Sequence, residues 1–380
     1  MQPLGLGVVG AGTLARRVLK HLVLPDVVST VVVTHICDTA PGRADAAARD
    51  FGVPRSSVTL DELLGDPSID AVTIASPISL HYEQGLAAIR AGKHVHFNKT
   101  MSVSLEEADQ LIDEASLRGV QLVASPGEML RPHHRRVRRL IEEGAIGQLC
   151  WAACGAALGT YHEDEPERSG DGSALGIDPS WYFRVPGGGP LYDMTVYALH
   201  AITGILGEVR RVTAMSGVRI KERHFGGRAI NTEAHDNTLM LLDFGENVFG
   251  FAYGTAAGIL SEGTPWDPNG RYYGTAGEIV GKTLNGSPFD YPGKELADQD
   301  LVGDQWLLPH VGPAHRPLVE QHVFEDVMQL VDLVREGTPT AATPEHARHV
   351  IEIIEASYRA AAHGVTQQLR TSISALSAAQ

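Results

Sequence analysis

The stretch of sequence that decides the fold lies close to the N-terminus and reads Leu4-Gly5-Leu6-Gly7-Val8-Val9-Gly10-Ala11-Gly12-Thr13-Leu14-Ala15. Its first half is a short, largely apolar run, and a glycine-rich turn follows at once. Apolar residues then recur at helical spacing, at Leu14, Val18 and Leu22. A strand, a glycine-rich turn and an amphipathic helix, in that order, form the context that the dinucleotide-binding fingerprint requires.

The small residues of this turn have distinct physical roles. Gly10 permits a tight turn, Gly12 lets the backbone approach a pyrophosphate, and Ala15 allows the helix to pack closely on the strand. The phosphates would then meet the helix N-terminus, at Thr13 and Leu14. Glycine turns also precede many other helices, but the flanking strand and helix favour a cofactor site here.

The second predicted strand, Val31–Cys37, ends immediately before an acidic residue, Asp38. A carboxylate in that place suits hydrogen bonds to the adenosine ribose hydroxyls, which favours NAD over NADP. The alternative is that Asp38 caps a helix that begins at about Pro41. Arg43 leaves NADP open, because a nearby arginine can accommodate a 2′-phosphate.

Strands and helices continue to alternate up to about residue 126. Strands are predicted at 71–76, 94–98 and 120–125, and capping boxes at Thr59–Glu62 and Ser104–Glu107 begin two helices. This alternation predicts a doubly wound parallel sheet over residues 1–126. In such sheets, ligands bind beyond the carboxyl ends of the strands. The candidate binding residues at those ends are Gly10, Asp38, Ser76, Asn98 and Lys99.

Beyond residue 126 the predicted strands follow one another directly. Strand-like runs cover 149–158, 209–218, 237–244 and 248–255, and Gly245-Glu246-Asn247 is typical of a hairpin turn between the last two. Such a succession predicts an α+β domain with a large, mostly antiparallel sheet over residues 127–366, followed by a tail at 367–380. The chain as a whole is thus expected to be an α/β protein. The polar segment 162–173 is expected to form a surface loop and lid.

Composition excludes several functional classes. A net charge of -15 over 380 residues argues against binding to nucleic acid and to anionic membranes. The three cysteines, Cys37, Cys150 and Cys154, are too few for a disulfide framework and lack zinc-site spacing, so no metal is expected. No apolar run reaches membrane-spanning length. We therefore expect a cytoplasmic protein that acts on a small molecule.

A second candidate site begins at the glycines Gly187–Gly189, which are followed by a proline and an apolar helical pattern. Asp193, Tyr197 and His200 are spaced i, i+4 and i+7, so a helix would carry all three on one stripe. A carboxylate, a phenol and an imidazole aligned in this way form a plausible acid–base site. The alternative is a helix whose polar edge faces solvent.

Together these motifs resemble the Gfo/Idh/MocA family of nicotinamide-dependent oxidoreductases over nearly the whole chain. The motifs that carry the resemblance are Gly10–Ala15, Asp38, Ala75-Ser76-Pro77 with His81, Ala91–Val95, Asn98-Lys99-Thr100, Ile146-Gly147, the glycine run with Asp193 and Tyr197, and Tyr273–Glu278. The resemblance implies a Rossmann domain that binds NAD(P), at a site that includes Pro77 and His81. It also implies sugar or polyol substrates and a second domain whose sheet forms a homodimer or homotetramer interface.

Residue by residue, the family's strand-end lysine matches Lys99, and its Asp-x-x-x-His/Tyr pair matches Asp193 and Tyr197. The tyrosine variant is that of members similar to glucose–fructose oxidoreductase and dihydrodiol dehydrogenase. The sequence departs from the family's Glu-Lys-Pro at Asn98 and Thr100. Asn98 could still hydrogen-bond the nicotinamide ribose, although without a charge, and Thr100 does not impose the backbone that proline would. A third departure is Ile78, where an asparagine is usual.

The chemistry of alcohol oxidation suggests roles for these residues. A phenol is a poor base at neutral pH, but a nearby ammonium favours the phenolate. The family's domain arrangement implies that Lys99 lies near Tyr197, so we expect Tyr197 to transfer the proton and Lys99 to tune it and to bind the substrate oxygen. Asp193 would orient the substrate or the lysine. His200 is a further candidate, as acid–base group, substrate contact or structural histidine.

Two questions stay open at the level of sequence. Trp181 and Arg184 could form a wall against which a sugar stacks, although core packing is an equal alternative for the aromatic residue. The leading function is hydride transfer between a secondary hydroxyl or ketone of a sugar, polyol or glycoside and the nicotinamide. The alternatives are a redox-neutral enzyme that uses NAD for glycoside cleavage or epimerisation, and a non-catalytic NAD(P)-binding sensor.

Overall fold

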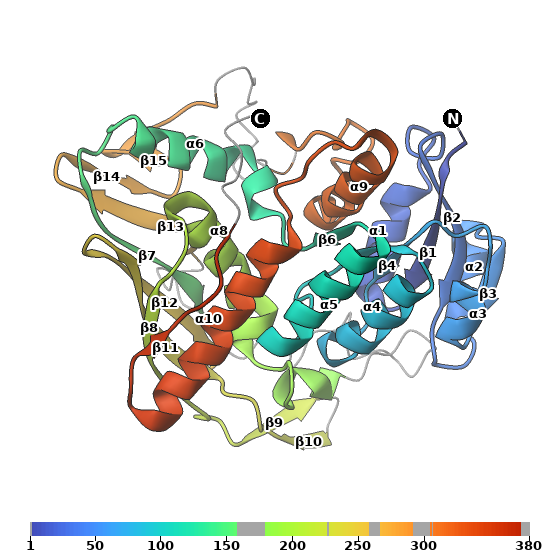
Figure 1. The fold of residues 1–380 in the computed structure, drawn as a ribbon, viewed down its shortest axis with the longest axis horizontal. Coiled ribbons are helices and arrows are strands. Elements are labelled where there is room, and N and C mark those ends of the chain that lie inside the picture. The colour runs from blue at the N-terminus through green and yellow to red at the C-terminus, as the bar shows by residue number, and fades with distance from the viewer. Residues whose placement is uncertain are drawn as a thin grey trace. The chain divides into compact units, whose positions relative to one another are not determined.

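The computed structural model describes residues 2–157, 179–225, 228–257, 267–291, 305 and 307–373. Within these ranges the chain forms two compact units (Figure 1). The first unit combines the N-terminal part up to Pro126 with the later segment Leu308–Pro344. The second holds most of what lies between them, together with the residues from Glu345 onward.

The first unit is built on a six-stranded parallel sheet in the order β3-β2-β1-β4-β5-β6. The strands are β1 (Leu4–Val9), β2 (Val31–Cys37), β3 (Arg55–Ser57), β4 (Ala71–Ile74), β5 (His94–Phe97) and β6 (Leu122–Ala124). The predicted doubly wound sheet is confirmed. Its strand order reverses between β1 and β4, which is where such sheets bind nucleotides.

Helices cover this sheet, and two of them begin at the caps that the sequence predicted. They are α1 (Thr13–Leu22), α2 (Arg43–Phe51), α3 (Leu60–Leu64), α4 (His81–Arg90) and α5 (Leu105–Arg118), with the short 3₁₀ turn η1 (Ile78–Leu80). The side chains of Thr59 and Ser104 accept hydrogen bonds from the backbone amides of Glu62 and Glu107. The N-cap hydrogen bond of each predicted capping box is thus present, and α4 and α5 lie side by side (Figure 1).

One further helix, α9 (Gln321–Glu336), completes the first unit from far along the chain. It packs against α1, β5 and β6, and at its C-terminal end Arg335 donates hydrogen bonds to the carbonyls of Gln2 and Thr30. The sequence-based division placed this helix in the range 127–366 of the second domain. The structure instead places α9 in the first unit, because the apolar side of this helix is buried on the first sheet.

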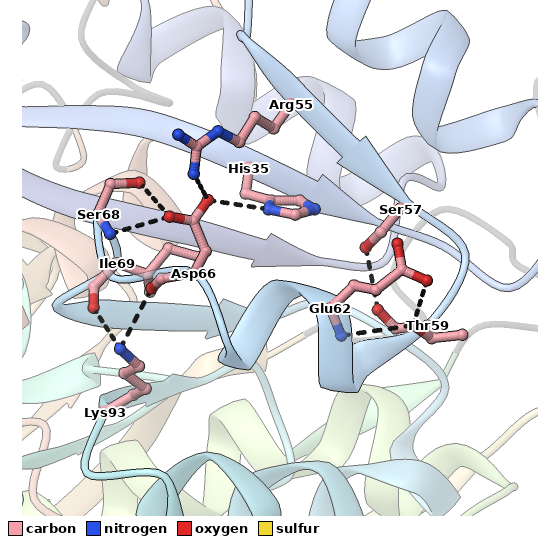
Figure 2. A network of polar contacts seen from close by, with 9 residues as sticks. All are labelled: His35, Arg55, Ser57, Thr59, Glu62, Asp66, Ser68, Ile69 and Lys93. Atoms are coloured by element: carbon pink, nitrogen blue, oxygen red, sulfur yellow. Dashed lines mark hydrogen bonds and ion pairs between the residues drawn. The ribbon is translucent and has the colours of Figure 1, made fainter.

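A polar network around the buried Asp66 braces the amino ends of the first sheet (Figure 2). Asp66 precedes β4, and its carboxylate accepts hydrogen bonds from the amide and hydroxyl of Ser68, at 2.9 and 2.7 Å. Arg55 forms an ion pair with the same carboxylate, and Nδ1 of His35 lies 3.2 Å from it. Lys93, just before β5, donates to the carbonyl of Ile69 at 2.8 Å. These contacts join the loops before two strands, at the edge opposite their carboxyl ends.

The second unit is built on a nine-stranded sheet in the order β16-β15-β14-β13-β7-β12-β11-β8-β17. Its longer strands are β7 (Leu149–Ala157), β8 (Arg211–Gly217), β11 (Asn237–Gly245), β12 (Val248–Thr255), β13 (Asp267–Gly274) and β14 (Gly277–Val280). Short strands β15 (Thr283–Leu284), β16 (Ser287–Pro288) and β17 (Gln367–Gln368) extend it. Within the described residues, every pair of neighbouring strands in this sheet is antiparallel except β7 with β12, so the predicted mostly antiparallel sheet is confirmed.

The remaining elements of the second unit pack around this sheet. They are the 3₁₀ turns η2 (Glu128–Leu130) and η3 (Pro179–Phe183), the wide turn η4 (Leu191–Thr195), the helices α6 (Pro132–Glu142), α8 (Val196–Leu206) and α10 (Pro344–His363), and the hairpin of β9 (Glu222–Phe225) with β10 (Arg228–Asn231). Helix α8 lies against β7 and β13. The predicted turn at Gly245 is confirmed, with Glu246 and Asn247 in left-handed conformations.

Two further sequence-based expectations concern parts of the chain that the structure covers incompletely. The predicted lid at 162–173 lies outside the described residues, as does the tail from 374 onward. Among the helices that the structure describes, none is long and apolar enough to cross a membrane.

Candidate functional site

The glycine-rich turn lies at the carboxyl end of β1 and leads into α1. Gly10 has a φ of 96°, and a Cβ at this position would lie 2.8 Å from the carbonyl oxygen of Ala75. Only glycine therefore fits there. Gly12 is the N-cap of α1 and has no side chain with which to satisfy the first helical amides. Those amides, at the half-buried residues Thr13 and Leu14, are left for an external acceptor such as phosphate.

Asp38 follows β2 and is joined to the glycine-rich turn. Its Oδ2 accepts a hydrogen bond from the amide of Ala11 at 2.8 Å, and its Oδ1 accepts one from the amide of Ala40 at 2.8 Å. The N-cap of α2 is Gly42, so the alternative role of Asp38 as the cap of that helix is excluded. The guanidinium of Arg43 lies 3.4 Å from Oδ1. A carboxylate offers about four lone-pair positions, so acceptor capacity is left for ribose hydroxyls.

The loops after β4 and β5 are joined by His81. Its Nδ1 lies 2.6 Å from the carbonyl oxygen of Thr100, and its Nε2 lies 2.9 Å from that of Ser76. Its side chain is fully buried, and burial lowers the pKa of the imidazole. The structure therefore places His81 beneath the sheet edge as a link between loops, while Ser76 and Pro77 are half-buried at the edge itself.

Asn98 and Lys99 follow the last residue of β5. The backbone amide of Asn98 donates to the carbonyl of Ile74 at 3.0 Å, but its side-chain Oδ1 is buried without a hydrogen-bond partner among the described residues. The half-buried Lys99 comes next, and the peptide bond between Lys99 and Thr100 is cis. A buried acceptor without a donor is costly, so this atom is suited to receive a hydroxyl from a ligand.

These features together fit a dinucleotide. The cradle at Gly10 excludes a side chain, the uncapped end of α1 suits a pyrophosphate, Asp38 suits the adenosine ribose, and the buried oxygen of Asn98 suits the second ribose. All four lie at the carboxyl ends of β1, β2 and β5. The observed edge is therefore chemically complementary to NAD.

No sequence signal pointed to Glu320, the residue before α9. It adopts a left-handed conformation with φ of 69°, and its Oε1 accepts a hydrogen bond from Arg17 at 3.0 Å. Burial raises the pKa of this carboxyl, but the positive charges of His322, Arg17 and Lys99 outweigh it and lower the pKa below its usual range. Glu320 thus adds a carboxylate to the electrostatic surroundings of Lys99.

In the second unit, the predicted helix after the glycines begins with a wide turn. The glycines allow close packing: a Cβ on Gly188 would lie 2.2 Å from the carbonyl oxygen of Arg184. Residues Leu191–Thr195 form a π-helical turn, and regular α-helix starts only at Val196. π-helical turns are rare in proteins, and many of those that occur lie at functional sites. Asp193 lies within it, which changes its angular relation to Tyr197 from the one that a regular helix would give.

The three residues predicted to share one stripe differ in exposure. Asp193 is buried, Tyr197 is half-buried, and His200 is only 2% exposed. Tyr197 and His200 lie three residues apart on the regular helix α8, and His200 is the more deeply buried of the two. The ring of His200 lies 4.5 Å from that of His346 on α10, and burial together with neighbouring histidines lowers its pKa well below the usual value. This environment is that of a structural histidine.

Of the two residues predicted to contact a sugar, Trp181 lies on η3 and Arg184 directly follows it, just before the glycines. The rings of Trp181 and Tyr182 stack with centroids 3.7 Å apart, and both are half-buried, while Arg184 is exposed. Both aromatic rings therefore keep some accessible surface.

Comparisons with known proteins cover both units. Residues 4–125 match the family model described as an oxidoreductase family with an NAD-binding Rossmann fold, and residues 134–280 match the model of the GFO/IDH/MocA C-terminal domain. A 1,5-anhydro-D-fructose reductase from Ensifer adhaerens is 32% identical over 207 residues, which cover 53% of this chain and 56% of that protein. A levoglucosan dehydrogenase from Pseudarthrobacter phenanthrenivorans is 26% identical over 342 residues, which cover 83% of this chain and 82% of that protein.

Solved structures show the same fold. A levoglucosan dehydrogenase in complex with NADH and L-sorbose has a TM-score of 0.73 at 21% identity and covers 98% of this chain and 100% of its own. GenD2 from gentamicin A biosynthesis, in complex with NAD, has a TM-score of 0.71 at 22% identity, and the match covers 98% of this chain and 97% of GenD2.

Proposed function

The chain belongs to the Gfo/Idh/MocA family of oxidoreductases, and from this membership we propose that it transfers a hydride between NAD and a secondary hydroxyl or ketone of a sugar, polyol or glycoside. The named relatives support this substrate class, since they are a reductase of an anhydro sugar and a dehydrogenase of levoglucosan. NADP is the second choice of cofactor, because Arg43 lies beside Asp38.

One observation carries the proposal furthest, namely the buried Oδ1 of Asn98. It lies at the end of β5 in the same unit as the Gly10 cradle and Asp38. A folded chain rarely leaves a buried acceptor unsatisfied unless something else supplies the donor. A ribose hydroxyl is a donor of the right kind, so the departure from the family's glutamate is compatible with cofactor binding.

The residues predicted to act on the substrate have separate roles in this proposal. When bound, the nicotinamide accepts or returns the hydride. Tyr197 exchanges the proton of the substrate hydroxyl, and Lys99 stabilises negative charge on that oxygen. Asp193, held in the wide turn, orients the substrate, and Trp181 and Arg184 contact the sugar ring.

The test starts with binding and then asks for turnover. The purified protein is titrated with NADH and NADPH by fluorescence, and it is then incubated with NAD and a pool of sugars and polyols. Accumulation of free NADH, traced to one member of the pool, is the expected result. Sugar conversion without NADH would instead select the redox-neutral alternative. Binding without conversion of any sugar would select the sensor.

We also propose that the second unit pairs with another copy of the chain through the outer face of its sheet. The rings of Trp151 and Tyr273 stack with centroids 4.1 Å apart, and Phe249 lies next to Trp151 in register. On the same sheet, the side chains of Leu241 and Phe251 are opposite each other and also exposed. An apolar patch of this kind marks an interface. Sedimentation of the wild type as a dimer or tetramer, and of Trp151→Glu as a smaller species, is expected.

A further inference from the structure

A chain of buried hydrogen bonds crosses three neighbouring strand ends of the first unit. Oγ1 of Thr73, on β4, lies 2.8 Å from Nδ1 of His96, on β5. Nε2 of His96 lies 2.9 Å from Oγ of Ser125, which follows β6. The hydroxyl of Ser125 in turn donates to Asp326 on α9. None of the four residues is more than 4% exposed, so solvent does not compete with these bonds.

The donors and acceptors of these hydrogen bonds can be assigned in one consistent way. An ionised carboxylate only accepts, so the Ser125 hydroxyl donates to Asp326 and its oxygen accepts the Nε2–H of His96. Nδ1 of His96 must then accept from the hydroxyl of Thr73. This arrangement requires a neutral imidazole, and burial lowers the pKa of His96 to about 3.

This chain of hydrogen bonds passes through His96, two residues before Asn98 at the carboxyl edge of the sheet. Asn98 lies two residues beyond His96, directly after β5, and its amide continues the ladder by donating to the carbonyl of Ile74 at 3.0 Å. Thr73 pairs with His96 in the strand register, and the amide of Ser125 donates to the carbonyl of Phe97 at 2.9 Å. Any tilt of the His96 ring therefore acts on the backbone that places the Asn98 side chain.

We propose that Thr73, His96, Ser125 and Asp326 are positioning residues that hold the buried acceptor of Asn98 in the orientation that binds the nicotinamide half of the cofactor. This inference rests on the proposed function, because it assumes that a dinucleotide occupies the edge. It assigns α9 a part in binding, since Asp326 anchors the chain from that helix. Preorganised binding groups lower the cost of ordering when the ligand arrives.

The test removes one hydroxyl without changing the volume of the side chain. Thr73→Val leaves Nδ1 of His96 without its donor, and Thr73→Ser restores the hydroxyl. We expect the dissociation constant for NADH, measured by fluorescence titration, to rise about tenfold in Thr73→Val and to return to within about twofold of the wild type in Thr73→Ser. Asp66→Asn is the matched control, because it disrupts the polar network of Figure 2 at the opposite edge. It should lower the melting temperature and leave NADH affinity unchanged.

A double-mutant cycle separates positioning from general destabilisation. If Thr73 acts through Asn98, the effect of Thr73→Val on NADH affinity falls below about twofold in an Asn98→Ala background. Equal NADH affinity of Thr73→Val and the wild type would overturn the inference, as would an undiminished effect in that background. If Thr73→Val does not fold, Ser125→Ala is measured in the same cycle. A wild-type protein that binds neither NADH nor NADPH would overturn the proposed function itself.

Discussion

The carboxylate of Asp38 and the backbone amide of Ala11 are joined by a hydrogen bond of 2.8 Å. The bond links the end of β2 to the glycine-rich turn after β1, so one side chain both shapes the turn and offers acceptors to a ribose. The sequence alone left Asp38 as either a ribose ligand or the cap of the next helix; Gly42 is that cap, so the structure excludes the second role and leaves room for the first.

Substitution of Asp38 by alanine should therefore impair both cofactor affinity and stability. Hydrogen bonds to charged groups contribute about 1.5–3 kcal/mol, so NADH affinity is expected to fall by about 10- to 100-fold. Asp45→Ala is the control, since Asp45 lies on α2 and accepts a solvent-exposed hydrogen bond from the hydroxyl of Ser56. Fluorescence titration with NADH checks both. An Asp38→Ala protein with wild-type affinity would show that the ribose is bound elsewhere.

Tyr197→Phe should abolish proton transfer while sparing the cofactor. Loss of a general acid–base group lowers turnover by about 10²–10⁴-fold. Tyr197 belongs to the second unit, and NADH affinity should stay within about twofold of the wild type, which separates chemistry from binding. Tyr273→Phe, on the outer sheet face, is the matched control with wild-type turnover expected. Steady-state kinetics on the substrate found in the pool provide the measurement.

His310 predicts a loss of stability at alkaline pH. Its Nδ1 lies 3.0 Å from Glu325 and its Nε2 lies 3.2 Å from Asp332. Burial alone would lower its pKa, but the hydrogen bonds to Asp332 and Glu325 raise the pKa of His310 to about 10.

The direction of the pH dependence follows from the pKa of His310 in the folded chain and in the unfolded chain. Below about pH 6.5 the imidazole is protonated in both the folded and the unfolded chain, and its contribution is fully present. As pH rises from there toward 10, the contribution is lost. We expect His310→Gln to be less stable by about 2 kcal/mol at pH 6 and to approach the wild type near pH 10, in urea unfolding at several pH values. Parallel pH profiles of the two proteins would contradict this.

Asp66 predicts the opposite dependence. Burial raises the pKa of its carboxyl, but hydrogen bonds from Ser68, Arg55 and His35 outweigh that effect and hold the pKa well below its usual range. The contribution is present above about pH 4, where the unfolded chain is also ionised, and is lost as pH falls toward the folded pKa. Asp66→Asn should therefore be less stable by about 2 kcal/mol at pH 7, with the difference shrinking in acid. If the stability difference between Asp66→Asn and the wild type grew in acid, the predicted direction of the pH dependence would be wrong.

Local features were predictable from the sequence where a few neighbouring residues determine them. The caps at Thr59 and Ser104, the hairpin at Glu246-Asn247 and the glycine-rich turn at Gly10 each depend on residues only a few positions apart. The parallel sheet followed from the alternation of such elements. For the same reason, the polar residues at the carboxyl edge could be named in advance.

Other features depend on contacts between distant segments and left no mark in the sequence. The apolar stripe of α9 predicts a buried helix, but nothing in it specifies which sheet buries it. The wide turn at Leu191–Thr195 has no signature of its own, so the sequence placed Asp193 at regular helical spacing from Tyr197, which the structure does not keep. The link from Thr73 to Asp326 spans residues more than 250 positions apart and required the structure.

The late return of α9 has a consequence for how the protein is made. During synthesis the N-terminal 126 residues leave the ribosome first, yet the helix that covers β5 and β6 spans Gln321–Glu336. Until that helix emerges, apolar surface on the nascent sheet stays uncovered and Ser125 lacks its carboxylate partner. We therefore expect the nucleotide-binding unit to complete its fold only after most strands of the second unit's sheet have been synthesised, although its own six strands precede them in the chain.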